Sequence, residues 1–275
     1  MPYPPALIED LQDRARVLRK NVIISIGKGN FGHLGGSFSA ADIVAALFFH
    51  KMNIDPKNPK MPNRDRFLLS KGHVAVLQYS ALAELGYFPH DELKHTKHIG
   101  SMLQGHPDLC KTPGVEASTG SLGQGLSIGL GLALGLRLDG IKSNVYVLVG
   151  DGELAEGQIW EAAMAAGIFK TEKLVAILDK NNAQAMGKTE KRFPIDKIGE
   201  KWAAFGWRVI EIDGHNMEEI VTALDQSSEA DGRPTVIIAN TVKGKGFKVA
   251  EDHEAGFHNV LLTEELYMQA MALFE

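Results

Sequence analysis

Two short polar clusters, each following an apolar run, carry the residue types best suited to chemistry in this sequence. The run at residues 145–149 ends in a Gly-Asp-Gly triplet at 150–152, and the run at 174–178 ends in Asp-Lys-Asn-Asn at 179–182. Short runs of β-branched and aliphatic residues predict buried parallel strands. Neighbouring parallel strands end at the same edge of a sheet, where open α/β sheets bind ligands. We therefore expect the two clusters to form one site.

Three interpretations of these clusters compete. The glycines could serve a plain βαβ turn, or residues 150–155 could be a G-x-G-x-x-A dinucleotide fingerprint, with Asp179 rather late for a ribose contact. The third interpretation is a metal-bridged diphosphate site. A carboxylate between two glycines would repel a bare diphosphate unless a divalent cation lay between them. Mg²⁺ prefers oxygen ligands, and Asp151, Asn181 and a nearby main-chain carbonyl supply them. The ligand chemistry favours this third interpretation.

Further motifs occur in a fixed order around these clusters. They are Gly-His-Leu-Gly-Gly at 32–36, Asn-Arg-Asp-Arg-Phe-Leu-Leu-Ser-Lys-Gly-His at 63–73, Gly-His-Pro-Asp at 105–108, Thr-Gly-Ser-Leu-Gly-Gln-Gly at 119–125, and Gly-Lys-Gly at 244–246 with His258 beyond. Together with Gly-Asp-Gly and Asn-Asn, they make the chain resemble the thiamine-diphosphate enzymes. Specifically, it resembles the amino-terminal, diphosphate-binding half of transketolase, from about residue 10 to about 262.

The expected fold is α/β. The resemblance implies a thiamine-diphosphate-binding fold, with a mostly parallel sheet and helices on both faces, and we expect residues 1–275 to form a single domain. Apolar periodicity predicts an amphipathic helix at 6–27, and Ser37 or Ser39 would cap the next one. Strands are expected at 65–70, 207–212 and 234–239, and helices after residue 73, over 217–227 and over 263–274. Glycines four apart predict a helix whose one side approaches another backbone closely, with packing as the role of Gly129 to Gly135.

The resemblance also implies roles for individual residues. A divalent cation, Mg²⁺ or another such as Ca²⁺, would be held by Asp151, Asn181 and the main-chain carbonyl of Ala183. Thiamine diphosphate would contact His73, Gly120, Ser121, Leu122, Asp151, Gly152, Glu153, Asn181, Ala185 and His258. The implied catalytic residues are Glu156 and four histidines suited to proton transfer, His33, His73, His106 and His258. Glu156 would couple across a subunit interface to the glutamate that activates the cofactor.

Two positions depart from the family pattern, and two lysines stay ambiguous. Ala185 stands where many relatives have a bulkier aliphatic residue, and Phe247 stands where the family usually has serine. Lys243 and Lys245 are either solvated charge or part of the site.

Composition is consistent with a cytoplasmic enzyme. The chain has 275 residues, 44% hydrophobic content and a net charge of −5, which argues against a nucleic-acid surface. A single cysteine excludes an internal disulfide and suits a reducing compartment. No secretion signal is evident. The sparsely charged window at 117–136 contains six glycines, so we expect a buried helix there and no membrane span.

The implied activity is that of a transketolase, which moves a two-carbon ketol unit from a ketose phosphate to an aldose, as in pentose phosphate metabolism. The family's pyrimidine-binding domain has no counterpart before residue 275. We therefore expect a partner subunit that carries this domain, with two copies of each chain. The alternatives are the alpha subunit of a 2-oxo acid dehydrogenase or decarboxylase, a deoxyxylulose-phosphate synthase, and a non-catalytic regulatory subunit that binds the cofactor.

Overall fold

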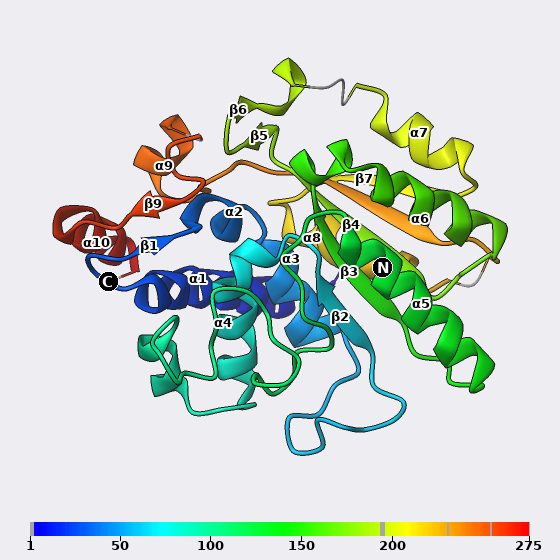
Figure 1. Ribbon diagram of the computed structural model, residues 1–275, viewed down its shortest axis with the longest axis horizontal. Coiled ribbons are helices and arrows are strands. Elements are labelled where there is room, and N and C mark those ends of the chain that lie inside the picture. Colours follow the sequence, from blue (N-terminus) through cyan, green and yellow to red (C-terminus); the bar gives the residue numbers. More distant parts are fainter. Residues whose placement is uncertain (1–2, 193–195, 230, 254, 275) are drawn as a thin grey trace.

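A five-stranded parallel sheet forms the centre of the computed structural model (Figure 1), which describes residues 3–192, 196–229, 231–253 and 255–274. The strand order is β2-β3-β4-β8-β7, and every neighbouring pair is parallel. The strands are β2 (Arg66–Leu69), β3 (Val145–Gly150), β4 (Leu174–Lys180), β7 (Arg208–Asp213) and β8 (Thr235–Asn240). Apart from shifts of one or two residues at their ends, these are the strands that the apolar runs predicted.

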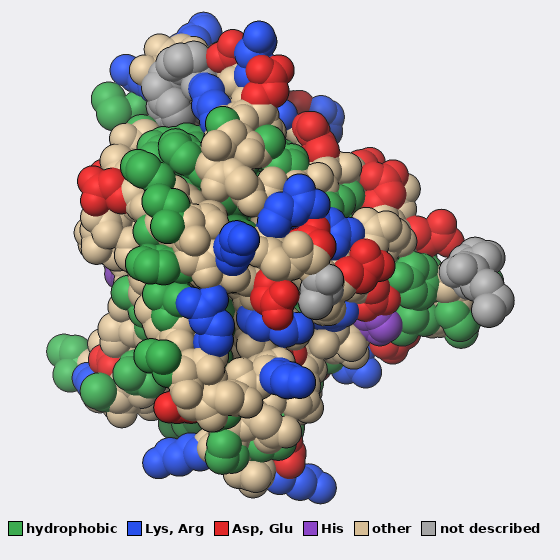
Figure 2. All heavy atoms as spheres, turned by 90° about the vertical axis from the view of Figure 1, so that its right-hand side faces the viewer, with side chains coloured by type: hydrophobic (Ala, Val, Ile, Leu, Met, Phe, Trp, Pro, Cys, Tyr) green, Lys and Arg blue, Asp and Glu red, His purple; other side chains and the backbone are tan. Residues whose placement is uncertain are grey.

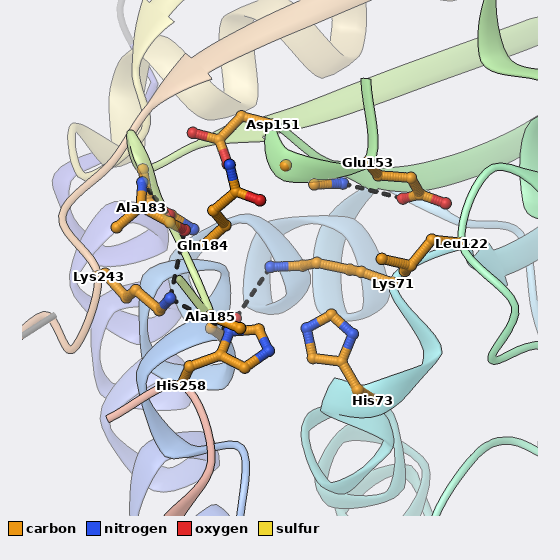
Figure 3. Close-up of a pocket in the computed structure, with 14 residues that line it drawn as sticks. Lys71, His73, Leu122, Asp151, Glu153, Ala183, Gln184, Ala185, Lys243 and His258 are labelled. Atoms are coloured by element: carbon orange, nitrogen blue, oxygen red, sulfur yellow. Dashed lines mark hydrogen bonds between the residues drawn. The ribbon is translucent and has the colours of Figure 1, made fainter. Parts of the chain in front are cut away.

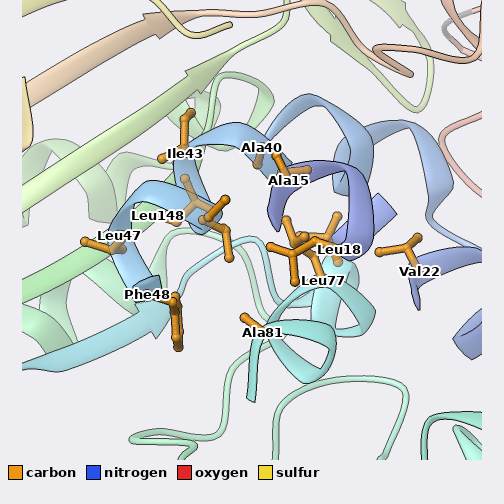
Figure 4. Packing of buried hydrophobic residues seen from close by; sticks show 14 of the residues in the cluster. Ala15, Leu18, Val22, Ala40, Ile43, Leu47, Phe48, Leu77, Ala81 and Leu148 are labelled. Carbon is orange, nitrogen blue, oxygen red and sulfur yellow. The ribbon is translucent and has the colours of Figure 1, made fainter. Parts of the chain in front are cut away.

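Helices cover both faces of the sheet, as expected. One face packs against α1 (Pro5–Ile26), α3 (Ala41–Ala46), α4 (Ala75–Leu85) and α8 (Met217–Gln226), and part of this core is drawn in Figure 4. The other face packs against α5 (Gln124–Leu138), α6 (Gly157–Ile168) and α7 (Ile198–Ala204). Successive strand side chains point to opposite faces, so Tyr146 and Leu148 lie in the first core while Val145 and Val147 lie in the second. The predicted α/β class is confirmed.

Shorter elements surround the sheet. The antiparallel pairs are β1 (Phe31–Gly32) with β9 (Val260–Leu261) and β5 (Ala183–Gln184) with β6 (Gly187–Lys188). The remaining helices are α2 (Leu34–Ser39), α9 (Lys248–Asp252) and α10 (Glu264–Met271), and short single-turn segments occur at Leu47–Lys51, Gly72–Val74, His90–His95, Gly152–Ala155, Thr189–Lys191 and Ala272–Phe274. The β1–β9 pair brings the histidine-bearing segments near residues 33 and 258 together, although they are far apart in sequence.

The prediction that Ser37 or Ser39 caps a helix is wrong. Helix α2 begins at Leu34, so both serines lie inside it. The hydroxyl of Ser37 donates to the carbonyl of His33 at 2.6 Å, and that of Ser39 donates to Asp179 at 2.7 Å. The helix can begin this early because Gly35 has no side chain. A Cβ there would lie 2.8 Å from the carbonyl oxygen of Phe257.

The glycines of α5 divide into two groups. An added Cβ at Gly125 would lie 2.4 Å from Oγ of Ser70, and one at Gly129 would lie 2.5 Å from Val147. These two glycines therefore allow the close approach to the sheet that was predicted. Gly131 and Gly135 meet nothing within 4 Å, so the packing explanation is wrong for them within this chain. No helix in the described ranges has the length and apolarity needed to cross a membrane.

Candidate functional site

Loops after β2, β3, β4 and β8 meet at the carboxyl edge of the sheet and enclose a pocket of about 130 Å³ (Figure 3). This edge is where the sequence placed the site, because Gly150 and Asp179 are paired in the register of β3 and β4. The predicted residues that line the pocket are His73, Leu122, Asp151, Gly152, Glu153, Asn181, Ala183, Ala185 and His258.

The other predicted residues lie around the pocket without lining it. The ring of His33 packs against His73 and His258, with centroids 4.9 and 5.4 Å away. His106 is exposed and lies against Gly120, where an added Cβ would be 3.0 Å from its ring. Ser121 and Glu156 are exposed, and Glu156 is the residue immediately before α6. The structure therefore brings the histidines at 33, 73 and 258 together and keeps His106 and Glu156 at the periphery.

Asp151 is a buried carboxylate without a cationic hydrogen-bond partner among the described residues. The residue is 2% exposed, and its Oδ2 accepts a hydrogen bond from the backbone N–H of Asn182 at 2.5 Å. Burial, together with the nearby negative charge of Asp179, raises its pKa to about 7. A buried carboxylate of this kind is costly to ionise unless a cation compensates it.

Asp179 is also buried, but its acceptors are filled. It accepts from the ammonium of Lys71 at 2.5 Å, from Ser39 at 2.7 Å, from Asn181 Nδ2 at 2.9 Å, and from the hydroxyl of Thr241. Burial acts to raise its pKa, but Lys71 and the hydrogen bonds hold the pKa below its ordinary value. A carboxylate occupied in this way cannot bind a ribose, which removes the basis of the dinucleotide interpretation.

The three predicted metal ligands all line the pocket. Asn181 is held by Asp179 through its amide nitrogen, and its Oδ1 accepts from the backbone N–H of Ala183 at 3.1 Å. The carbonyl oxygen of Ala183 accepts from Lys243 Nζ at 3.2 Å. A carboxylate, an amide oxygen and a main-chain carbonyl are the donor types that Mg²⁺ and Ca²⁺ prefer. The donor set fits a hard divalent cation, for which the buried Asp151 would be the negatively charged ligand.

Glu153 lines the pocket, but its carboxylate is used to hold loops. Oε1 accepts from the backbone N–H of Gly123 at 2.7 Å and from the hydroxyl of Ser70, while Oε2 accepts from the N–H of Gly150 at 3.2 Å. Burial raises its pKa. These bonds fasten the glycine-rich loop before α5 to the ends of β2 and β3. The structure thus gives Glu153 a positioning role for the backbone predicted to contact the cofactor.

The three clustered histidines are uncharged at neutral pH. The rings of His73 and His258 are 5.1 Å apart, which closes the triangle with His33. Burial, followed by nearby positive charges, lowers the pKa of His33 and His258 to about 4 and that of His73 to about 2. His106 is exposed to solvent on one side, but partial desolvation by its neighbours, followed by the charge of Lys97, also lowers its pKa. Neutral imidazoles can accept or donate hydrogen bonds and can take up a proton during a reaction.

Of two lysines in the site, Lys71 was not identified from the sequence and Lys243 was left ambiguous. Lys71 is 3% exposed and Lys243 is 2% exposed, and both line the pocket (Figure 3). The solvated-charge interpretation is therefore wrong for Lys243, whereas Lys245 is half-buried and does not line the pocket. A usable signal was available, because each of these two lysines follows a predicted strand closely and precedes a glycine, at the same sheet edge as Asp151.

The two departures from the family pattern have different surroundings. Ala185 lines the pocket, so a small side chain forms that part of its wall. Phe247 is 3% exposed and packs edge-on against Phe257 at a centroid distance of 5.8 Å. The phenylalanine therefore belongs to the core beneath the pocket.

Comparison with known proteins agrees with this geometry. Residues 10–271 match the family model described as "Transketolase, thiamine diphosphate binding domain". The chain is 47% identical, over 97% of its length and 96% of the relative's, to the 6-deoxy-6-sulfo-D-fructose transketolase subunit SqwG of Clostridium sp. (strain MSTE9). It is 38% identical to an apulose-4-phosphate transketolase subunit of Phocaeicola vulgatus, over 96% of this chain and 93% of the relative.

A solved structure shows the same fold. The transketolase from Campylobacter jejuni is 34% identical and superposes with a TM-score of 0.88, covering 97% of this chain but only 43% of that longer protein. The chain therefore belongs to the transketolase family, in which it corresponds to the thiamine-diphosphate-binding domain.

Proposed function

We propose that this chain is the diphosphate-binding subunit of a two-chain transketolase, which transfers a two-carbon ketol unit from an anionic ketose to an aldose. The observation that carries the proposal is the mixed lining of one pocket. Asp151, Asn181 and Ala183 can offer oxygens to a cation, and the neutral imidazoles of His73 and His258 line the same pocket. Residues 1–275 would act as one domain, since both cores share the five-stranded sheet.

A divalent cation, Mg²⁺ or Ca²⁺, is the proposed link between the chain and the diphosphate. Asp151, the amide oxygen of Asn181 and the carbonyl of Ala183 would hold it. The buried ammonium group of Lys243 makes the same pocket favourable for phosphate oxygens. When bound, thiamine diphosphate supplies the carbanion and the electron sink of the reaction.

Proton transfer is assigned to histidines because they are neutral where substrate hydroxyls would arrive. His33, His73 and His258 form the triangle beside the pocket, and His106 lies at its outer rim on the loop next to Gly120. Each can hold a proton for part of the reaction without first having to lose one.

The second half of the active site is proposed to come from a partner chain with a pyrimidine-binding domain, in a complex with two copies of each chain. The pocket of about 130 Å³ is smaller than the roughly 300–1,000 Å³ of sites that enclose a whole small-molecule ligand. Two relatives are themselves named as transketolase subunits. Glu156, which is exposed and directly precedes α6, would meet the cofactor-activating glutamate of the partner.

Exposed apolar residues of α5 and α6 mark the proposed partner surface. Ile128 of α5 and Met164 and Ile168 of α6 are 36%, 46% and 73% exposed. The face drawn in Figure 2 shows hydrophobic side chains gathered along the side on which α5 and α6 lie. Gly131 and Gly135, which face open space, would let a partner backbone approach closely.

The substrate is proposed from the relatives, whose names mention 6-deoxy-6-sulfo-D-fructose and apulose 4-phosphate. Both are ketoses with an anionic group at the end remote from the carbonyl. We therefore propose such a ketose as donor, within carbohydrate metabolism of the cytoplasm, and place pentose phosphates among the compounds to be compared.

The test is to assay ketol transfer by the purified chain alone and after co-expression with a chain resembling the middle and carboxyl-terminal domains of transketolase. Each sample receives thiamine diphosphate, Mg²⁺ and one of four donors: sulfofructose, apulose 4-phosphate, xylulose 5-phosphate or fructose 6-phosphate. We expect aldose release only from the two-chain complex. Sustained turnover by the isolated chain would refute the split enzyme, and 2-oxo acid decarboxylation by the complex would favour the dehydrogenase alternative.

A further inference from the structure

The segment that follows β8 carries Lys243 into the pocket and is fastened at several points. The hydroxyl of Thr241 donates to Asp179, and the N–H of Gly244 donates to the carbonyl of Gly35 at 3.0 Å. Between these two points, the backbone N–H of Val242 donates to Nε2 of His215 at 2.8 Å. This side chain comes from the loop between β7 and α8, outside the pocket. His215 is thus fixed to the residue directly before Lys243.

The other nitrogen of His215 faces a buried carboxylate. Nδ1 lies 2.7 Å from Oδ2 of Asp42 in α3, and the two side chains are only 10% and 11% exposed. Asp42 also accepts from Arg19 of α1, with distances of 3.0 and 2.6 Å to its two oxygens. Burial acts to raise the pKa of Asp42, but the hydrogen bond from His215 and the charge of Arg19 hold it below its ordinary value.

These contacts fix which imidazole nitrogen carries the proton. An ionised carboxylate is only an acceptor, so Nδ1 of His215 must donate to Asp42. A backbone N–H is only a donor, so Nε2 must be bare to accept from Val242. Both conditions are met by one neutral tautomer, with the hydrogen on Nδ1. The more common arrangement, with the hydrogen on Nε2, would place two donors against each other at Val242.

Close packing keeps the two loops together. An added Cβ at Gly214, next to His215, would lie 2.4 Å from the methyl of Thr241 and 3.1 Å from Cβ of Ala239. Only glycine lets the β7–α8 loop approach the end of β8 this closely. This packing holds the backbone at residues 214–215 beside the end of β8, and the contact with Asp42 then orients the imidazole of His215.

We propose that His215, oriented by Asp42 and Arg19, is a positioning residue that holds the Val242 backbone and thereby aims the ammonium of Lys243 at the diphosphate side of the pocket. The contact of Lys243 with a diphosphate rests on the proposed function. The tautomer of His215 and its hydrogen bond to Val242 do not depend on that function. It extends the site to α1 and α3, which lie beneath the sheet and contribute no side chain of this network to the pocket.

Two substitutions separate the two hydrogen bonds of His215. In His215→Gln, the amide oxygen can occupy the place of Nε2 and accept from Val242, while the contact with Asp42 is weakened. In His215→Asn, the amide nitrogen can still donate to Asp42, but the shorter side chain cannot reach Val242. His98→Asn, at an exposed histidine, is the matched control.

The first measurement uses the full chain without cofactor. Imidazole ¹⁵N shifts should show the hydrogen of His215 on Nδ1, and amide hydrogen exchange should report the hold on Val242. We expect exchange at Val242 to accelerate roughly tenfold in His215→Asn, as for loss of one hydrogen bond, and to stay near wild type in His215→Gln and His98→Asn. A proton on Nε2, or equal exchange in all variants, would overturn the proposal.

The second measurement is calorimetric titration of the same proteins with thiamine diphosphate and Mg²⁺. His215→Asn should weaken binding about tenfold, and it should cause no further loss when Lys243→Met is already present. Additive losses would overturn the link to Lys243. If the wild-type chain and its partner complex bound no cofactor, the proposed function would fall, while the exchange result would still decide the role of His215.

Discussion

The ends of β3 and β4 carry two buried aspartates in opposite electrostatic situations. Asp179 receives an ammonium, two hydroxyls and an amide, and its pKa is lowered. Asp151, one strand away, receives a backbone N–H at 2.5 Å, and its pKa is raised to about 7. Their strands are adjacent, with Gly150 and Asp179 in register, so the difference comes from the partners that the tertiary structure brings to each.

This contrast distinguishes Asp179, a structural carboxylate, from Asp151, a carboxylate suited to binding a cation. Asp179 joins α2, β2, β4 and the end of β8 through buried hydrogen bonds, so its charge is balanced within the chain. Burial makes the negative charge of Asp151 unfavourable unless a cation compensates it. Carboxylates whose pKa is strongly perturbed in a pocket are candidates for function. Asp151, which has fewer hydrogen-bond donors than Asp179, is also the residue that the metal interpretation requires.

The largest expected effect concerns the neutral histidines. Because Asp179 is assigned a structural role and Asp151 a role in cation binding, proton transfer is left to the histidines. His106→Ala and His258→Ala should each bind cofactor but lower turnover of the two-chain complex by roughly 10²–10⁴-fold. Steady-state rates on the best donor and calorimetric cofactor affinity would check this. His98→Ala is the control, since that residue is exposed and away from the pocket. Wild-type rates in both variants would show that neither histidine takes part.

The next effect tests Asp179 as a structural residue. Asp179→Ala should lower the free energy of unfolding by about 3–5 kcal/mol, because it leaves the ammonium of Lys71 buried without its counter-ion. Urea unfolding at pH 7 would measure it. Adding Lys71→Met to Asp179→Ala should recover part of the loss. A loss below about 1 kcal/mol, the range of an exposed ion pair, would break the distinction between the two aspartates.

Asp151→Ala should instead act on the cofactor. We expect Mg²⁺-dependent affinity for thiamine diphosphate to fall by about 100-fold or more, since even residues behind metal ligands typically contribute 10–100-fold. Calorimetric titration with and without Mg²⁺ would show it, with Asp139→Ala at an exposed site as control. Unchanged affinity would mean that the Gly-Asp-Gly triplet is only a turn.

The smallest expected effect is a pH dependence of stability without metal. The pKa of Asp151 is about 7 in the folded chain against 3.8 ordinarily, so its contribution is most favourable below pH 4 and is lost as the pH rises to 7. Asp151→Asn removes this loss. The variant should therefore be more stable than wild type at pH 8, on the order of 2 kcal/mol, and should differ little at pH 4.

Thermal unfolding across this pH range, repeated with Mg²⁺ and thiamine diphosphate, would check the result. With Mg²⁺ and thiamine diphosphate present, wild type should become more stable than Asp151→Asn at pH 8, because a protein that binds ligands in its folded state is stabilised by them. A variant less stable than wild type at pH 8 without ligands would contradict the proposed cost of the buried charge.

Much of the site could be predicted because its polar residues sit directly after strands. Asp151 and Asn181 follow the apolar runs of β3 and β4, and parallel pairing alone brings them together. The helix start at Leu34 could not be predicted from cap preferences, because it depends on a glycine packed against the carbonyl of Phe257, more than 200 residues away. The local preference of serine for a helix start was overridden by that tertiary contact.

By itself, the sequence determined the α/β class, the strand ends that carry Asp151 and Asn181, and the motifs of the transketolase family. These features are local, since they depend on runs and spacings of a few residues. Only the tertiary structure decided the electrical state of each group. The fold buries Lys71 beside Asp179, whereas Asp151 accepts a hydrogen bond from a backbone N–H. It also buries Lys243 and places His215 between Asp42 and Val242. Charge, protonation and tautomer follow from burial and from partners distant in the chain, which no short stretch of sequence contains.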